Sequence, residues 1–335
     1  DKTIIDECII QKIIAKIAKI PEKAGSATEM DKLKNLETEL KSKIFAQDKA
    51  VEAVCKAVKK SRAGFRNPEK PIANFLFAGP TGVGKTELAK VLAQNLDSQL
   101  LRFDMSEYQE KHTVSRLIGS PPGYVGFEDG GLLTDAVRKN PSAVVLLDEI
   151  EKAHSDIYNL LLQIMDYGFL TDNQGKKADF RNTIIIMTSN AGASQIGKSQ
   201  IGFGDNVTTE SVIDEEVAKI FTPEFRNRLD AIIHFAHLEK KDILNVVTKE
   251  LHILQSQLQE KNVTLEFTPE AVEFLAEKGY SKEFGARNIS RTVENYISSQ
   301  LVDEVLFGKL AKGGKVTCYI DKSNSDLQDI KFNYE

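Results

Sequence analysis

The residues with the clearest chemical meaning form one glycine-rich stretch. The phosphate-binding pattern G-x-x-x-x-G-K-S/T is matched by Gly79-Pro80-Thr81-Gly82-Val83-Gly84-Lys85-Thr86. Glycines let backbone N–H groups point into one concavity, and the positive end of a following helix attracts phosphate. The pattern predicts a polyphosphate site in which Lys85 contacts the β- and γ-phosphates and the Thr86 hydroxyl binds Mg²⁺. The alternative is an ordinary glycine-rich turn between a strand and a helix.

Two acidic residues follow an apolar run further along the chain. Asp148 and Glu149 come directly after Val144–Leu147, and unpaired carboxylates at the end of a buried strand are costly to desolvate. A Mg²⁺ ion held by Asp148, directly or through water, would remove that cost. Glu149 would then be the general base that activates the attacking water. The alternative is an acidic cap for the helical residues that follow.

A third polar segment, Thr188-Ser189-Asn190, closes another apolar run. The carboxyl ends of strands in open α/β sheets face the ligand crevice. We therefore expect Asn190 to orient the attacking water against the γ-phosphate. The alternative is that Asn190 caps a turn before Ala191-Gly192.

The elements that must position these residues alternate between strands and helices. Strands are expected at 74–78, 100–104, 143–148 and 183–189, and helices at 86–97, 132–139 and 156–166. Helical patterns also cover 1–20, 29–43 and 47–61. The alternation predicts an α/β fold with a mostly parallel sheet and helices on both faces.

The pattern changes near residue 237. A long helix with one apolar face is expected at 243–258, and further helices at 269–278 and 289–306, with short strands at 263–267, 316–320 and 329–333. We therefore expect three parts. These are a linker or tail of a preceding module at 1–34, a large α/β nucleotide-binding domain at 35–237 and a small α+β lid at 238–335.

Composition and charge disfavour several classes of protein. The 335 residues are 41% hydrophobic and 28% charged, which is typical of soluble globular proteins, and no apolar run approaches the roughly 20 residues of a membrane span. The net charge of −5 disfavours nucleic acid as a partner. Three scattered cysteines favour a reducing, cytoplasmic compartment over disulfides or zinc. Because the chain starts at Asp1 without Met or a signal peptide, we expect it to be a piece of a longer protein.

Taken in order, these motifs resemble those of the AAA+ ATPases. Three longer stretches resemble the Clp unfoldases in particular: 77–87, 119–126 and 221–230. The sequence is most similar to the second ATPase module of the ClpA members, over about residues 35–320. The resemblance implies that the bound group is ATP or ADP with Mg²⁺.

The same resemblance assigns further residues around the nucleotide. Ile44 and Phe45 match the segment beside the adenine base, although an apolar pair before a helix is also typical of plain core. Arg228 matches the arginine finger that enters the neighbouring subunit's site and stabilises charge on the γ-phosphoryl group, and only the resemblance separates it from Arg226. Arg287 matches a sensor on the small domain that contacts the γ-phosphate in the same subunit.

A short glycine-flanked motif, Gly123-Tyr124-Val125-Gly126, matches a substrate-gripping pore loop. The resemblance implies a homo-hexamer whose six copies of Tyr124, next to Val125, line an axial pore. An aromatic ring can hold a polypeptide there by contact area without reading its sequence. The alternative is a tyrosine packed under a Pro-Pro-Gly turn. The polar stretch 168–181 matches a second pore loop, or is simply a solvated hairpin.

Ile201-Gly202-Phe203 lies in a polar stretch rich in glycine and serine. Exposed apolar side chains on such a loop need a partner. The resemblance implies that this tripeptide docks into apolar clefts of a ClpP-type peptidase, although ClpA members usually carry Leu where this chain has Phe203. Ile196-Gly197 is a weaker candidate, and the alternative is that the apolar side chains fold back onto the core.

The function implied is that of an ATP-dependent protein unfoldase and translocase. It would thread unfolded protein substrates, which adaptors also deliver in this family, through a hexameric pore into a ClpP-type peptidase. The nearest alternative is a ClpB-like disaggregase without a peptidase. A nucleic-acid motor is disfavoured by the acidic balance and the lack of a basic stripe. A scaffold that only binds ATP is disfavoured by the presence of Lys85, Glu149 and Arg228.

Overall fold

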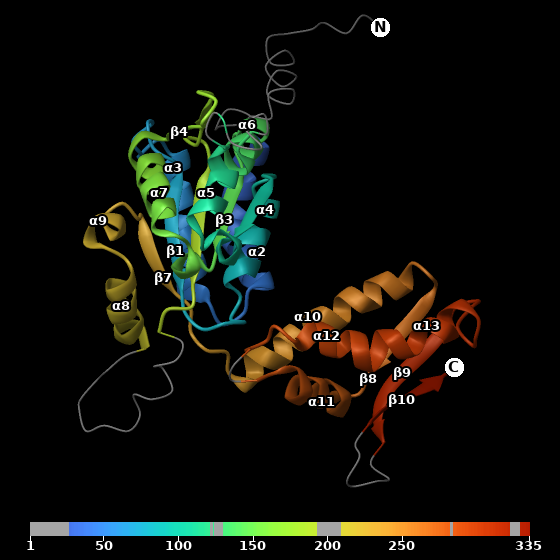
Figure 1. The fold of residues 1–335 in the computed structure, drawn as a ribbon. Helices are drawn as coiled ribbons and strands as arrows, with labels where there is room; N and C mark the ends of the chain where they lie inside the picture. The colour runs from blue at the N-terminus through green and yellow to red at the C-terminus, as the bar shows by residue number, and fades with distance from the viewer. Residues whose placement is uncertain (1–26, 121–122, 124–129, 193–208, 282–283, 322–328) are drawn as a thin grey trace, which may run out of the picture. The chain divides into compact units, whose positions relative to one another are not determined.

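The computed structural model describes residues 27–120, 123, 130–192, 209–281, 284–321 and 329–335 (Figure 1). They form two compact units: the larger extends to Phe235 without Thr81–Val83, and the smaller comprises Thr81–Val83 and the chain from Ala236 onward. The helix expected at 1–20 lies outside the described residues. None of the helices within these ranges is both long enough and apolar enough to cross a bilayer.

The larger unit is built on a five-stranded parallel sheet in the order β2-β3-β6-β1-β7. The strands are β1 (Ala73–Ala78), β2 (Leu100–Asp104), β3 (Val144–Asp148), β6 (Ile184–Ser189) and β7 (Ala231–His234). Every residue of β1, β3 and β6 is buried, as continuous apolar runs require when both faces of a parallel sheet are covered. The predicted α/β class is confirmed.

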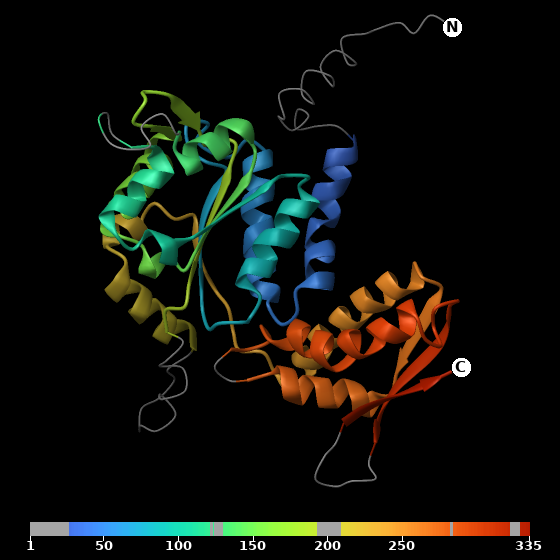
Figure 2. The same cartoon turned by 45° about the vertical axis from the view of Figure 1, so that its right-hand side comes forward.

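Helices cover both faces of this sheet (Figure 2). One face carries α2 (Ala27–Lys43), α3 (Asp48–Arg62) and α4 (Lys85–Asn95), and the other carries α5 (Lys111–Ile118), α6 (Leu132–Lys139), α7 (Ser155–Tyr167), α8 (Thr209–Ile220) and α9 (Pro223–Arg226). Two short 3₁₀ turns, η1 (Met105–Tyr108) and η2 (Ile150–Lys152), follow β2 and β3. On the second face, Val145 and Met187 of the sheet pack in one core with Ile157 of α7 and Ile213 of α8.

The polar stretch 168–181 contains a two-stranded hairpin, in which β4 (Phe169–Thr171) pairs antiparallel with β5 (Lys177–Asp179). Its connecting turn is fixed by Asp172, whose fully buried carboxylate pairs with Arg138 of α6 at 2.7 Å. The Arg181 guanidinium lies over the Phe169 ring, 4.5 Å from its centroid. The hairpin is therefore anchored to the larger unit by specific contacts.

The smaller unit combines helices with a three-stranded sheet in the order β10-β9-β8. It contains α10 (Lys240–Gln259), β8 (Val263–Phe267), α11 (Pro269–Gly279), α12 (Ile289–Val293), α13 (Ser299–Leu306), β9 (Gly314–Asp321) and β10 (Asp329–Tyr334). A π-helical turn, η3 (Glu294–Ser298), joins α12 to α13. The regular helix expected at 289–306 is thus interrupted, because a π turn accommodates one extra residue within a helix.

Candidate nucleotide site

The glycine-rich loop runs from the end of β1 to the first residue of α4. Gly79 and Gly84 adopt φ angles of 149° and 103°, which L side chains rarely adopt. A Cβ atom at Gly79 would lie 2.4 Å from the Phe235 carbonyl oxygen, whereas nothing lies within 4 Å of a Cβ position at Gly84. The loop is therefore closely packed at Gly79 and open at Gly84. The open end leaves the N-terminus of α4 accessible to an anion.

Lys85 links this loop to the carboxyl end of β6. Its ammonium group donates hydrogen bonds to the carbonyl oxygens of Gly79 and Pro80, both at 2.6 Å, and to Asn190 Oδ1 at 3.0 Å. Burial lowers the pKa of Lys85 to about 8, and the nearby charge of Glu151 opposes the shift. The structure thus brings Lys85 and Asn190 together, as the polyphosphate prediction requires.

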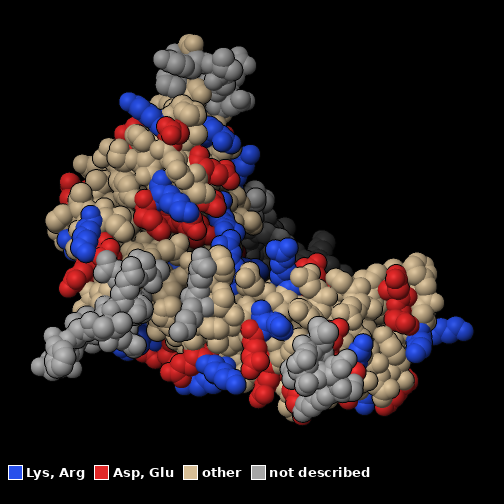
Figure 3. Space-filling view, turned by 60° about the horizontal axis from the view of Figure 1, so that its bottom comes forward, with Lys and Arg blue, Asp and Glu red and all other residues tan. Residues whose placement is uncertain are grey.

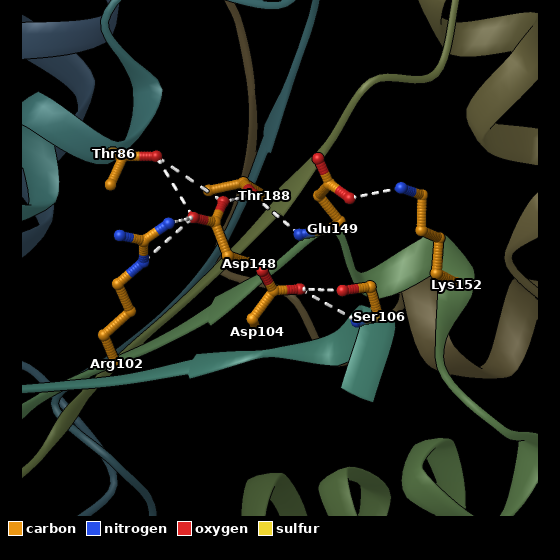
Figure 4. Close-up of polar contacts among 8 residues, drawn as sticks. All are labelled: Thr86, Arg102, Asp104, Ser106, Asp148, Glu149, Lys152 and Thr188. Carbon is orange, nitrogen blue, oxygen red and sulfur yellow. Dashed lines mark hydrogen bonds and ion pairs between the residues drawn. The ribbon is translucent and has the colours of Figure 1, made fainter. Parts of the chain in front are cut away.

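Asp148 lies at the end of β3, next to Thr86 of α4 (Figure 4). The Thr86 hydroxyl is 3.5 Å and 3.4 Å from the two carboxylate oxygens, and the buried Thr188 hydroxyl donates to Oδ1. A hydroxyl and a carboxylate are oxygen donors of the kind that Mg²⁺ prefers. Thr86 and Asp148 therefore fit a magnesium site, where the ion would neutralise phosphate charge.

Glu149 follows Asp148 in an unusual backbone conformation. Its φ angle is 56°, and a residue other than glycine in this left-handed region costs of order 1–3 kcal/mol. The backbone N–H donates to the Thr188 hydroxyl at 3.0 Å, which fixes this turn to the end of β6. The Glu149 carboxylate pairs with Lys152 at 2.5 Å, and that hydrogen bond raises the pKa of Lys152.

Two further residues in this cluster were missed by the sequence reasoning. Arg102 of β2 donates to Asp148 Oδ2 from Nε at 3.2 Å and from a terminal nitrogen at 2.7 Å. Glu151 accepts from the Asn190 backbone N–H at 3.0 Å. The only sequence signal for Arg102 is that a positively charged residue lies on a predicted strand. An ordinary solvated arginine gives the same signal.

The other predicted site residues belong to further segments of the chain or lie outside the described residues. Ile44 is buried, and with the half-buried Phe45 it joins α2 to α3. Arg228 donates from Nε to Asp166 at 2.6 Å and from a terminal nitrogen to the Glu224 carbonyl oxygen at 2.8 Å. Arg287 belongs to the smaller unit and precedes α12. A final set lies outside the described residues: Tyr124, Val125, Ile201, Gly202 and Phe203.

Comparisons with known proteins point to one family. Residues 70–232 match the model described as AAA domain (Cdc48 subfamily), and residues 238–318 match the C-terminal, D2-small domain, of ClpB protein. The chain is 56% identical, over 92% of its length, to a ClpA homolog protein of Fuscovulum blasticum. It is 47% identical over 93% to the chaperone protein ClpB of Clostridium tetani. It is 45% identical over 94% to the ATP-dependent Clp protease ATP-binding subunit ClpC of Staphylococcus epidermidis.

These matches cover 39%, 36% and 40% of the three relatives, so the chain spans about two fifths of their length. The first family model matches a segment of the larger unit, and the second matches a segment of the smaller unit. The chain therefore belongs to the Clp family of AAA+ ATPases.

Proposed function

We propose that this chain is an ATP-driven protein unfoldase and translocase module that passes polypeptides into a ClpP-type peptidase. The observation that supports the ATPase step most directly is the joining of three predicted groups at one edge of the sheet. Lys85, Asp148 and Asn190 come from three different segments and are connected there by hydrogen bonds through Thr86, Thr188 and Glu151. Side chains held in this way are positioned before substrate binds.

Each residue then has a defined task in hydrolysis. The loop N–H groups and Lys85 bind the phosphates, while Thr86 and Asp148 hold Mg²⁺. Glu149 takes a proton from the attacking water, and Asn190 orients that water. Glu149 is free to act as base only after its bond to Lys152 opens. Ile44 and Phe45 would contact the adenine of ATP or ADP.

Hydrolysis would depend on a ring of subunits. Arg228 would reach the γ-phosphate of a neighbour in a homo-hexamer, and Arg287 would contact the phosphate in its own subunit. Guanidinium groups suit both tasks because they make planar, paired hydrogen bonds to phosphate. In the described structure Arg228 is oriented by Asp166 and Glu224. Nucleotide-driven movement of the ring would then pull substrate through the pore by Tyr124 and Val125.

The main alternative is a ClpB-like disaggregase, because the names of the relatives divide between protease subunits and chaperones. The tripeptide Ile201-Gly202-Phe203 favours the peptidase-coupled reading, since an Ile and a Phe within a polar sequence would find an apolar partner on such a peptidase. A nucleic-acid motor would use a broad basic stripe. On the face drawn in Figure 3, acidic and basic side chains are instead interspersed.

The test is co-sedimentation of the Glu149→Gln chain with a ClpP-type peptidase and ATP. We expect a ring that carries the peptidase with it, and we expect replacement of Ile201-Gly202-Phe203 by Gly-Gly-Gly to release the peptidase but leave the ring. Replacing Ile196-Gly197 in the same way is the matched control and should change nothing. A ring that never binds the peptidase would favour the disaggregase.

A further inference from the structure

Arg102 is the cation that contacts the Asp148 carboxylate in the described part of the chain (Figure 4). It lies on β2, an edge strand that pairs with β3 so that Asp104 is opposite Asp148. Arg102 is two residues before Asp104 on the same strand. Its guanidinium donates to Asp148 Oδ2 from a terminal nitrogen at 2.7 Å and from Nε at 3.2 Å. Charge-assisted bonds from one guanidinium to one carboxylate are among the stronger hydrogen bonds in proteins.

The hydrogen bonds already made by Asp148 leave little room for a metal. A carboxylate has about four lone-pair sites. One receives the Thr188 hydroxyl, two receive the N–H groups of Arg102, and Thr86 lies within 3.4–3.5 Å of both oxygens. A magnesium ion, or a water bound to it, therefore needs one of these donors to leave.

Arg102 is the donor best able to leave. Thr188 is 1% exposed and also accepts the Glu149 N–H, so it is fixed on two sides. Thr86 is the expected fellow ligand of the metal. The Arg102 side chain is 52% exposed, whereas that of Asp148 is 11% exposed, so the guanidinium can move into water while the carboxylate stays. A guanidinium and a metal ion on one carboxylate would also repel each other.

We propose that Arg102 is a positioning residue that holds Asp148 in place before metal binds and is displaced when the metal–nucleotide complex arrives. The inference rests on the proposed role of Asp148 as a metal-binding residue. Arg102 then sets the concentration of Mg²⁺ at which the site fills, because the ion must compete with a charge that the chain itself supplies. Exchange of one cation for another would also keep Asp148 neutralised throughout.

The test measures the Mg²⁺ concentration that gives half-maximal binding of a fluorescent ADP analogue, which requires no hydrolysis. Arg102→Gln should lower this concentration by about threefold to tenfold, because the competing cation is gone. Arg102→Lys keeps the charge but loses the paired bonds, so it should fall between Arg102→Gln and the unchanged chain. Arg116→Gln removes an exposed positive charge from α5 and is the matched control, with no change expected.

A second readout is thermal unfolding without nucleotide. Arg102→Gln should lower the melting temperature in that condition, since Asp148 loses its counter-ion, and magnesium with ADP should restore it. If Arg102→Gln does not fold, Arg102→Lys alone carries the test. The proposal is overturned if the variants need as much Mg²⁺ as the unchanged chain, or more. If the unchanged chain itself shows no response to Mg²⁺, the proposed metal-binding role of Asp148 fails and the inference fails with it.

Discussion

The two units of this chain use buried polar groups in different ways. In the larger unit, the buried polar groups lie at the start of α4 (Lys85) and near the ends of β3 and β6 (Asp148 and Thr188), and they are bonded to residues far away in sequence. In the smaller unit, the two described polar residues that are buried serve local helix geometry. Asp242 accepts from the Glu239 N–H at the start of α10, and Thr292 donates to the Asn288 carbonyl oxygen. Convergence of distant polar groups, rather than burial itself, is what marks the candidate site.

The two sheets also differ in how many of their strand residues are buried. The larger unit has β1, β3 and β6 buried at every position, whereas β8 of the smaller unit alternates between buried and exposed residues along its first four positions. In a sheet that is covered on both faces, side chains on both sides of each strand are buried. In a sheet with one solvated face, buried and exposed side chains alternate along the strand. The larger unit can therefore support strained and charged groups at its strand ends, because the strands themselves are rigidly packed.

Truncation of one core residue in each sheet tests this contrast. Ile186 of the central strand β6 is fully buried, and Leu265 of the edge strand β8 is 3% exposed. We expect each change to Ala to cost about 2–5 kcal/mol of unfolding free energy, with Ile186→Ala near the upper end because its surroundings are least able to collapse. Urea denaturation with and without ADP and Mg²⁺ would measure both losses.

Ile186→Val is the matched control for the larger unit and should cost only about 0.5–1.5 kcal/mol. Nucleotide should raise the unfolding midpoint of the larger unit, because a ligand stabilises the part that it binds. A larger loss for Leu265→Ala than for Ile186→Ala would contradict the contrast between the sheets.

A smaller effect is expected from the buried charge of Lys85. Burial lowers its pKa to about 8, so the ammonium is charged below that pH and becomes neutral as the pH rises through it. Because phosphate binding favours the charged form, ADP affinity should fall above pH 8, by up to roughly tenfold at pH 9. Titration of ADP binding from pH 7 to pH 9 measures this.

Lys85→Gln provides the comparison for the pH series. Its ADP affinity should be weak at every pH and nearly flat over this interval, since the titrating group is absent. A flat profile in the unchanged chain would show that Lys85 keeps its ordinary pKa, and would remove the argument that it is buried as a charge.

Much of the larger unit was predictable because its signals are local. The strand 100–104 was predicted with the bounds that β2 has, and the loop at 79–86 was found from the local spacing of its glycines, Lys85 and Thr86. β7 was missed because Ala231–His234 is only four residues long and is a strand only through its pairing with β1. Arg102 was missed for the same kind of reason. Its partner is 46 residues away, and only the register of β2 on β3 brings the two together.

The smaller unit shows a different limit of sequence reasoning. The apolar spacing over 289–306 indicates a helix, and helix is found, but the π turn at Glu294–Ser298 leaves no mark in the spacing of apolar residues. Such a turn depends on how neighbouring residues pack, so it is decided by tertiary structure. Local spacing also carries no signal for the roles proposed for Arg228 and Arg287, because those roles depend on a neighbouring subunit or on both units of the chain.

The most direct test of the account is the turnover and retention of ATP by the Glu149→Gln chain. We expect ATP binding close to that of the unchanged chain, because Glu149 contributes to proton transfer and not to phosphate binding, together with turnover lowered by about 100-fold or more. Lys85→Ala is the control that should lose binding itself. Hydrolysis by Glu149→Gln at the rate of the unchanged chain would contradict the assignment of the base and the catalytic role of this strand end.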